Sequence, residues 1–178
     1  MNWNIQDNQG QTALHYAVKA HTQSEVLKWI VAHQATLNLD VNANVKDNEG
    51  QTPPHYLCSY PKNAEKLALF LQLTRVDVNV KDNKGETPLF KALSTLSTAN
   101  EEVVRMLLKN GANVHIRSNT DESLIDIARR NKFSEITICL LEKAEAIQHS
   151  PRFSQQDLSA ASESLEGKKI TLRQGYSK

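Results

Sequence analysis

The chain has 178 residues, of which 39% are hydrophobic, and its formal net charge at pH 7 is +1. This length and hydrophobic content suffice for a folded core, and the small net charge gives no strong electrostatic attraction to nucleic acid or to a membrane surface. The sequence contains no long apolar run and its first residues are polar, so we expect neither a transmembrane helix nor a signal peptide.

A short phrase of turn and helix-start residues recurs along the chain. It begins at Asp7, returns at Asp47 and Asp82, and has a weaker copy that begins at Ser118. Successive copies are therefore about 35 to 40 residues apart, a period that indicates stacked repeats. In such a protein each unit contacts its neighbours and a long open surface remains.

The third copy shows most clearly what each repeat builds. Gly85 completes a turn signature, Thr87 is a good N-cap, and Pro88 suits the first position of a helix. A polar connection separates this helix from a second one over residues 101–109, which Gly111 ends. We expect a turn, a helix, a loop, a second helix and an extended return in each of four repeats, at about 7–46, 47–81, 82–117 and 118–143.

This unit resembles the ankyrin repeat, whose pattern is a β-turn and two antiparallel helices with a Thr-Pro-Leu-His-x-Ala core. The resemblance covers residues 3–143. The first two copies carry the family's histidine as His15 and His55, whereas Phe90 and Asp126 replace it in the last two. The resemblance implies an all-α solenoid of stacked helix-turn-helix units with hairpin fingers.

The two ends of the chain leave alternatives open. The first residues align with the middle of a return segment, so the chain is either a fragment or has an adapted first repeat, on which Tyr16, Val18 and Trp29 would be exposed. Residues 144–178 are expected to hold a helix over about 154–165 that caps the fourth repeat. The alternative for this segment is a flexible linker or tail.

The sequence shows no constellation of catalytic or metal-binding residues, and nucleophile-elbow, phosphate-loop and zinc-protease motifs are absent. We expect His15 and His55 to bond adjacent hairpins, and Cys58 to be a small buried residue. Cys58 and Cys139 fall in non-adjacent repeats, so we expect no disulfide, and reduced thiols favour a cytoplasmic location. We therefore expect no enzymatic activity, no metal and no cofactor.

The resemblance also implies a surface for a partner protein, because ankyrin arrays usually bind through a concave face of turn tips and inner helices. Tyr60 is the expected anchor, since aromatic side chains often dominate interface energy, although it could instead wedge the loop before Pro61. By position, the turn residues are Asn8, Gln9, Gln11, Asn48, Glu49, Gln51, Asn83, Lys84 and Glu86, with Asn119, Thr120 and Glu122 in the fourth copy, and the inner-helix residues include Lys19, Tyr60 and Thr95.

A basic residue precedes each of the last three turns, at Lys46, Lys81 and Arg117. These residues would either form a cationic row that binds an acidic partner or pair with the adjacent aspartates, a contact of little energy when exposed. The spacing of Leu71 and Asn79 resembles the sequence pattern around asparagines that asparaginyl hydroxylases modify in ankyrin repeats. Asn79 is therefore a candidate hydroxylation site, and its alternative role is to bond the hairpin backbone.

The preferred hypothesis is a monomeric module that binds another protein, including the case of a bacterial effector that acts on a host protein in the host cytosol. The alternative is a non-catalytic scaffold or regulatory segment of a larger multidomain enzyme. We expect neither nucleic acid nor a membrane as the partner, because basic residues are not interleaved with aromatic ones.

Overall fold

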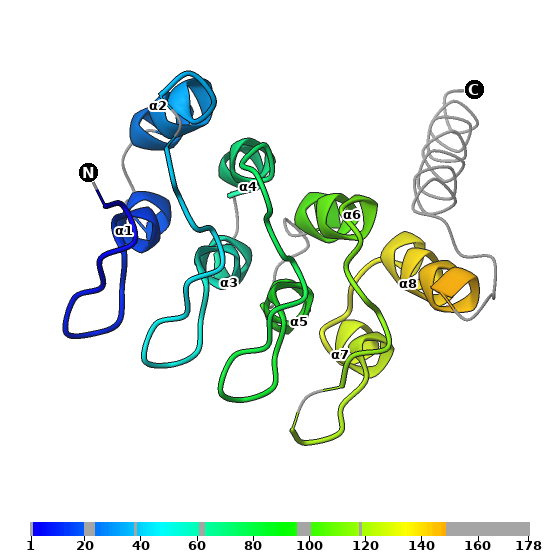
Figure 1. The fold of residues 1–178 in the computed structure, drawn as a ribbon. Coiled ribbons are helices and arrows are strands. Elements are labelled where there is room, and N and C mark those ends of the chain that lie inside the picture. The colour runs from blue at the N-terminus through cyan, green and yellow to red at the C-terminus, as the bar shows by residue number, and fades with distance from the viewer. Residues whose placement is uncertain are drawn as a thin grey trace, which may run out of the picture.

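The computed structural model describes residues 2–19, 24–37, 39–60, 63–95, 101–117 and 119–148, and all structural statements below concern these residues. Within them the chain forms eight α-helices and no strand. In Figure 1 the odd-numbered helices form one layer and the even-numbered helices form the other. The helices are α1 (Ala13–Lys19), α2 (Glu25–His33), α3 (Pro53–Ser59), α4 (Ala64–Phe70), α5 (Pro88–Ser94), α6 (Glu101–Lys109), α7 (Leu124–Arg130) and α8 (Glu135–Gln148).

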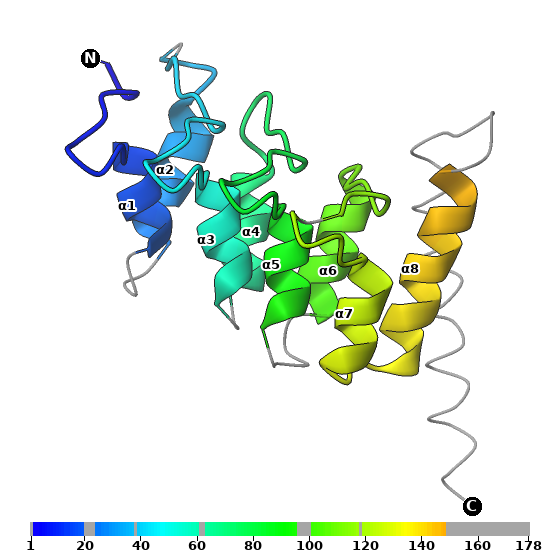
Figure 2. The same cartoon turned by 90° about the horizontal axis from the view of Figure 1, so that it is seen from below.

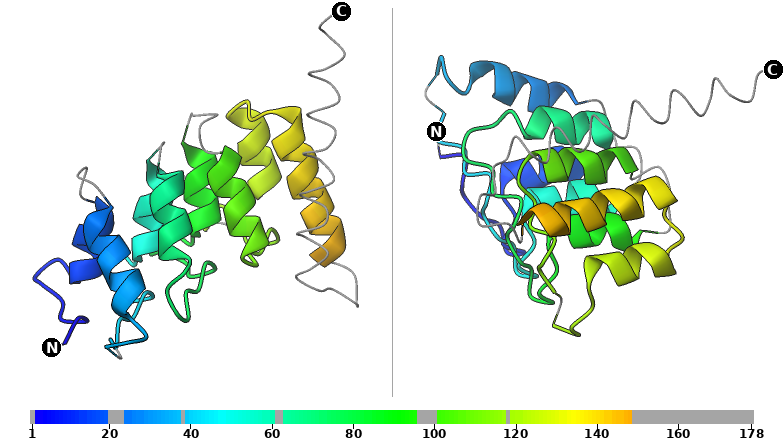
Figure 3. Two further views of the ribbon diagram at one scale, coloured as in Figure 1. Left: turned by 90° about the horizontal axis from the view of Figure 1, so that it is seen from above. Right: turned by 90° about the vertical axis from the view of Figure 1, so that its right-hand side faces the viewer.

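Each helix pair packs against the next pair along the chain. In one layer α1 contacts α3, α3 contacts α5 and α5 contacts α7, while in the other layer α2 contacts α4, α4 contacts α6 and α6 contacts α8. Figures 2 and 3 show the resulting row of helix pairs from other sides. The expected all-α solenoid is therefore confirmed, and interfaces between neighbouring repeats supply its stability.

The core lies between the two layers and runs through every repeat. Burying a side chain of leucine size contributes about 1.5–3 kcal/mol before entropy is subtracted. Leu71 and Ile125 are only half-buried, and Leu71 already follows the end of α4. The largest fully buried side chains are Leu27, Ile30, Leu57, Leu67, Phe70, Leu89, Leu93, Leu107, Leu108, Leu124, Ile127 and Leu141.

The local signals for helix ends act as the sequence predicts. The Thr87 hydroxyl accepts the backbone N–H of Phe90 at 3.3 Å, and the Ser123 hydroxyl accepts that of Asp126 at 3.1 Å. Gly111 has a φ of 82° and ends α6, where few other residues would adopt this conformation without cost. These contacts place each helix start directly after its turn.

The outer face of the first repeat is partly exposed, as expected. Tyr16 and Trp29 are 53% and 45% exposed. The prediction for Val18 was wrong, because this side chain is 3% exposed and belongs to the core. Val18 lies one helical turn after the buried Leu14 and therefore shares its face.

The end of the described chain is α8, which continues past Lys143 to Gln148. The fourth repeat thus has both of its helices, α7 and α8, in contact with each other. The helix expected over residues 154–165 lies outside the described residues.

Candidate partner-binding surface

Four turns project on one side of the helix layers, and we call them fingers 1 to 4: residues 7–11, 47–51, 82–86 and 119–122 (Figure 1). The aspartate at the start of finger 2 holds its shape, since Oδ1 of Asp47 accepts the backbone N–H groups of Glu49 at 3.0 Å and Gln51 at 2.9 Å. Asp7 and Asp82 bond the corresponding groups of fingers 1 and 3. Three fingers therefore share one closed conformation.

The second carboxylate oxygen of each aspartate contacts a side chain of the first helix of the same repeat, which we call the inner helix (α1, α3, α5 and α7). The Tyr56 hydroxyl donates to Oδ2 of Asp47 at 2.5 Å, and Tyr16 does the same to Asp7 at 2.5 Å. In the third repeat Lys91 takes this position, with its Nζ 3.0 Å from Oδ2 of Asp82. The three first fingers and the helices α1, α3 and α5 are thus joined by side chains.

These contacts shift the pKa values of the groups that make them. Burial disfavours the charged form of Asp82, but its bonds to Lys91 and to the backbone outweigh this, so the pKa of the carboxyl is lowered. Burial and the bond to Asp47 raise the pKa of Tyr56, while the bond to Asp7 raises that of Tyr16. Both phenols therefore remain protonated donors at neutral pH.

Successive fingers are joined by the asparagine in their second position. Asn48 donates its backbone N–H to the carbonyl of Gln9 and its side-chain amide to that of Asn8, each at 3.0 Å. Asn83 and Asn119 make the same two contacts with the finger before them. The tip asparagines therefore use their donors to hold the fingers in a row.

His15 and His55 connect neighbouring repeats, as we expected from the sequence. Nδ1 of His55 accepts the backbone N–H of Thr52 at 3.1 Å, so the ring proton lies on Nε2, which faces the carbonyl of Glu86 at 3.0 Å. His15 repeats this arrangement one layer earlier, with Thr12 and with the carbonyl of Gln51. Burial lowers the pKa of both imidazoles, so the neutral form stabilises the stack.

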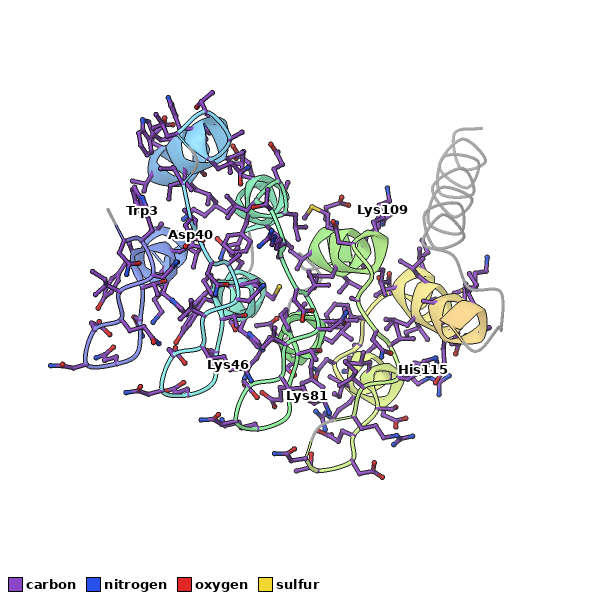
Figure 4. All side chains as sticks on the ribbon, in the orientation of Figure 1. Trp3, Asp40, Lys46, Lys81, Lys109 and His115 are labelled. Carbon is purple, nitrogen blue, oxygen red and sulfur yellow. The ribbon has the colours of Figure 1, made fainter. Side chains whose placement is uncertain are left out.

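The two lysines of the basic row, labelled in Figure 4, bridge successive repeats at the base of the fingers. Nζ of Lys46 donates to the carbonyl of Lys81 at 2.8 Å, and Nζ of Lys81 donates to that of Arg117 at 3.3 Å. Asp47 and Asp82 bond inner-helix side chains instead of these lysines, whereas Arg117 lies 3.6 Å from the carboxylate of Asp121 in its own turn. That the row binds an acidic partner stays a prediction.

The inner-helix surface differs between its two halves. In the first two repeats it is aromatic: Nζ of Lys19 lies 3.9 Å from the centre of the Tyr56 ring, and Tyr60 is 51% exposed. In the last two repeats ion pairs dominate, between Lys91 and Glu86 and between Arg130 and Glu122. This surface therefore carries aromatic rings at one end and charged pairs at the other.

Two protein-family models match this chain. The model described as ankyrin repeats (3 copies) matches residues 34–118, and the one described as ankyrin repeats (many copies) matches residues 1–53. The chain belongs to the ankyrin-repeat family. Ankyrin repeats are generally protein–protein interaction modules and are typically non-catalytic. A comparison of this ankyrin-repeat protein with curated proteins found no match.

Most of the residues that we expected to bind a partner are accessible. Gln11 is different, because it is only 8% exposed and bonds Asp7 at the base of its finger rather than lying at the tip. Lys19, Gln51, Glu86 and Thr95 are half-buried. The exposed residues are Asn8, Gln9, Lys46, Asn48, Glu49, Tyr60, Lys81, Asn83, Lys84 and Arg117, together with Asn119 and Thr120 of finger 4.

The structure adds residues that sequence reasoning missed. Tyr16 and Tyr56 line the aromatic half, and Lys91 links finger 3 to α5. One signal was present in the sequence: a tyrosine follows the finger aspartate by nine residues in both of the first two repeats. Local turn and helix rules do not connect positions that far apart.

The side chain of Asn79 bonds the backbone of the next repeat. Its side-chain amide donates to the carbonyl of Gly111 at 3.0 Å, and its Oδ1 accepts the backbone N–H of Asn113 at 2.7 Å. This is the structural role that we gave as the alternative to modification. Hydroxylation of Asn79 stays a prediction.

Three further observations concern chemistry other than partner binding. Both cysteines are free, and burial raises the pKa of the Cys58 thiol. Among the residues with described positions, no three His, Cys, Asp or Glu side chains are grouped so that they could hold a metal ion. In the same part of the chain, no helix is long and apolar enough to cross a membrane.

Proposed function

We propose that this ankyrin-repeat protein binds a partner protein through its fingers and the inner helices α1, α3, α5 and α7. The main support for this proposal is that side-chain contacts of Asp7, Asp47 and Asp82 hold the fingers against these helices. A surface that is ordered before binding loses less conformational freedom when a partner arrives. The accessible tips of the fingers are thereby held as one rigid edge.

The composition of this surface defines the kind of partner that it fits. The exposed rings of Tyr16 and Tyr60 offer anchor positions for apolar side chains, since tyrosine is enriched among the residues that dominate binding energy. The bases at the foot of the fingers favour acidic groups on the partner. Because the tips themselves are rich in amides, we expect a polar interface of moderate affinity.

We further propose that binding takes place in the cytosol, which the two free thiols support. A bacterial effector would bind a host protein there, whereas a scaffold or regulatory segment of a larger enzyme would bind another domain of its own protein. Affinity capture separates these cases, because a host protein is recovered from extract in the first case alone.

The test is affinity capture from cytosolic extract followed by mass spectrometry, with the wild-type chain beside a Tyr60→Ala, Lys84→Glu double variant. Tyr60 and Lys84 are exposed on the proposed surface. The matched control is Lys109→Glu, an equal charge change at the end of α6, in the layer away from the fingers (Figure 4). We expect a protein retained by the wild type and the control but lost with the double variant. Equal retention by all three would refute this surface.

A further inference from the structure

Exposed apolar surface is concentrated in the first repeat. Of the six large hydrophobic side chains that are exposed among the described residues, four belong to this repeat and a fifth, Ile5, lies just before it. Val26 and Trp29, on α2, are 58% and 45% exposed. These five are Ile5, Tyr16, Val26, Trp29 and Leu37. Tyr16 belongs to the partner-binding surface, whereas Val26 and Trp29 line one hollow on α2. Exposed apolar side chains that lie together mark an interaction surface more often than scattered single residues do.

Helix α2 has one side that packs and one that does not. Leu27 and Ile30 are buried, and α2 contacts α1 and α4. Val26 and Trp29 are three residues apart on an adjoining side of the helix and remain exposed, and Figure 1 places α2 at the N-terminal end of its layer. Among the described residues nothing covers Val26 and Trp29, so this side of α2 is accessible to a second molecule.

The indole of Trp29 is held in place rather than loose. It stacks on the His33 ring with 4.6 Å between centroids, and the ring of Trp3, in the segment before finger 1, lies 6.2 Å away. Nδ1 of His33 in turn lies 2.8 Å from the carbonyl of Trp29. An ordered aromatic ring loses little conformational entropy on binding, which favours its use as an anchor.

Charges on α2 make this surface complementary to itself. Glu25 and Lys28 border Val26 and Trp29 around one shallow hollow, and their charged atoms are 3.3 Å apart. Their side chains are 67% and 47% exposed. If a second copy of α2 lies antiparallel across a two-fold axis, its Lys28 meets Glu25 of the first copy and its Glu25 meets Lys28. The apolar side chains then pack against each other beside the two charge pairs.

We propose that the exposed side of α2, made of Glu25, Val26, Lys28 and Trp29, binds a second copy of this chain in a two-fold symmetric dimer. A two-fold interface uses the same patch on both copies, as this charge pattern requires. Because a single helix of nine residues offers a small contact area, the dimer has a dissociation constant of roughly micromolar size.

The dimer departs from the monomer that we expected from the sequence, and it is independent of the proposed function. The fingers lie on the side of the layers away from α2 (Figure 1), so both copies keep their partner-binding surfaces free. Two such surfaces in one particle bind a multivalent partner more tightly than one does, without any new contact.

The first test is sedimentation velocity of the full chain over about 1 to 200 µM, a range that brackets the expected dissociation constant. Glu25→Lys makes both charges positive and Lys28→Glu makes both negative, so each variant repels its own copies. We expect each alone to weaken dimerisation by about tenfold, and an equal mixture of the two to recover it as a heterodimer. A mixture that stays monomeric, like its components, would overturn the proposed symmetry.

The second test removes the apolar anchor. Trp29→Ser should weaken the dimer by more than about tenfold, whereas Tyr60→Ser, an equally exposed aromatic outside this surface, should leave it unchanged. Circular dichroism checks that each variant keeps its helices. A wild-type chain that remains a monomer at every concentration overturns the proposal, as does a dimer that Trp29→Ser leaves intact.

Discussion

Replacing His55 with alanine should destabilise the array strongly, because its buried ring joins two repeats. The ring of His55 makes three contacts: with the backbone N–H and the hydroxyl of Thr52, and with the carbonyl of Glu86 in the next repeat. Both His55 and Thr52 are fully buried. The variant therefore leaves buried polar groups of two repeats without their partner.

The magnitude follows from these contacts. Each hydrogen bond contributes about 0.5–1.5 kcal/mol, and unsatisfied buried groups cost more, so we expect the free energy of unfolding to fall by about 3–4 kcal/mol near neutral pH. A domain of this kind has about 5–15 kcal/mol in total. The control is His33→Ala, whose ring contacts only the surface of α2, and it should cost less than about 1 kcal/mol.

The effect of His55→Ala should also depend on pH. Burial lowers the pKa of His55 below its unfolded value of 6.5, so below that pH the unfolded chain binds more protons than the folded one. The stabilisation is fully present above about pH 6.5 and is lost as the pH falls toward the lowered pKa. At about pH 5 the difference between wild type and variant should shrink, by at most about 2 kcal/mol.

The assay is urea unfolding of wild type, His55→Ala and His33→Ala at both pH values, followed by circular dichroism. A loss below about 1 kcal/mol for His55→Ala would refute the reasoning about buried contacts. A difference that stays constant between the two pH values would refute the neutral imidazole as the stabilising form.

Three further predictions concern local contacts. Gly50→Ala should cost about 2 kcal/mol in urea unfolding, because φ is 75° and the new Cβ would lie 2.4 Å from Oδ1 of Asn83; an unchanged midpoint would contradict this. Lys91→Met should cost about 3 kcal/mol at neutral pH, since it leaves the buried carboxylate of Asp82 unpaired. Because the pKa of Asp82 is lowered, the difference in unfolding free energy between wild type and Lys91→Met is present above about pH 4. It should vanish as the pH falls through the lowered pKa. In a Cys139→Ser variant the remaining thiol, Cys58, should react with a thiol reagent only after unfolding, and rapid reaction of the folded protein would contradict its burial.

Much of this fold could be predicted because each repeat encodes its turn and its helix start within a few residues. Gly85 adopts a φ of 75° and Thr87 caps α5, both as local rules require. Val18 was wrongly predicted to be exposed because it lies in the first repeat. It follows Leu14 by one helical turn and therefore lies on the same buried face. Periodicity decides which face of a helix is buried, even at the end of an array.

The candidate surface was harder to predict, because its contacts join positions that only the stack brings together. The acceptor for Lys46 is a backbone carbonyl one repeat later, and that depends on the distance between layers. Tyr56 reaches Asp47 across a turn and a helix start. Lys91 takes the same role with different chemistry, so a search for repeated residue types would not have found it.

The central claim is that the fingers and the inner helices bind a partner protein. Hydrogen exchange of the chain, alone and in complex with the captured partner, tests this most directly. We expect slower exchange in fingers 1 to 3 and at the C-terminal ends of α1 and α3, while α2, α4 and α6 exchange as in the free chain. Protection confined to α4 and α6 would contradict the claim and move the binding site to the opposite layer.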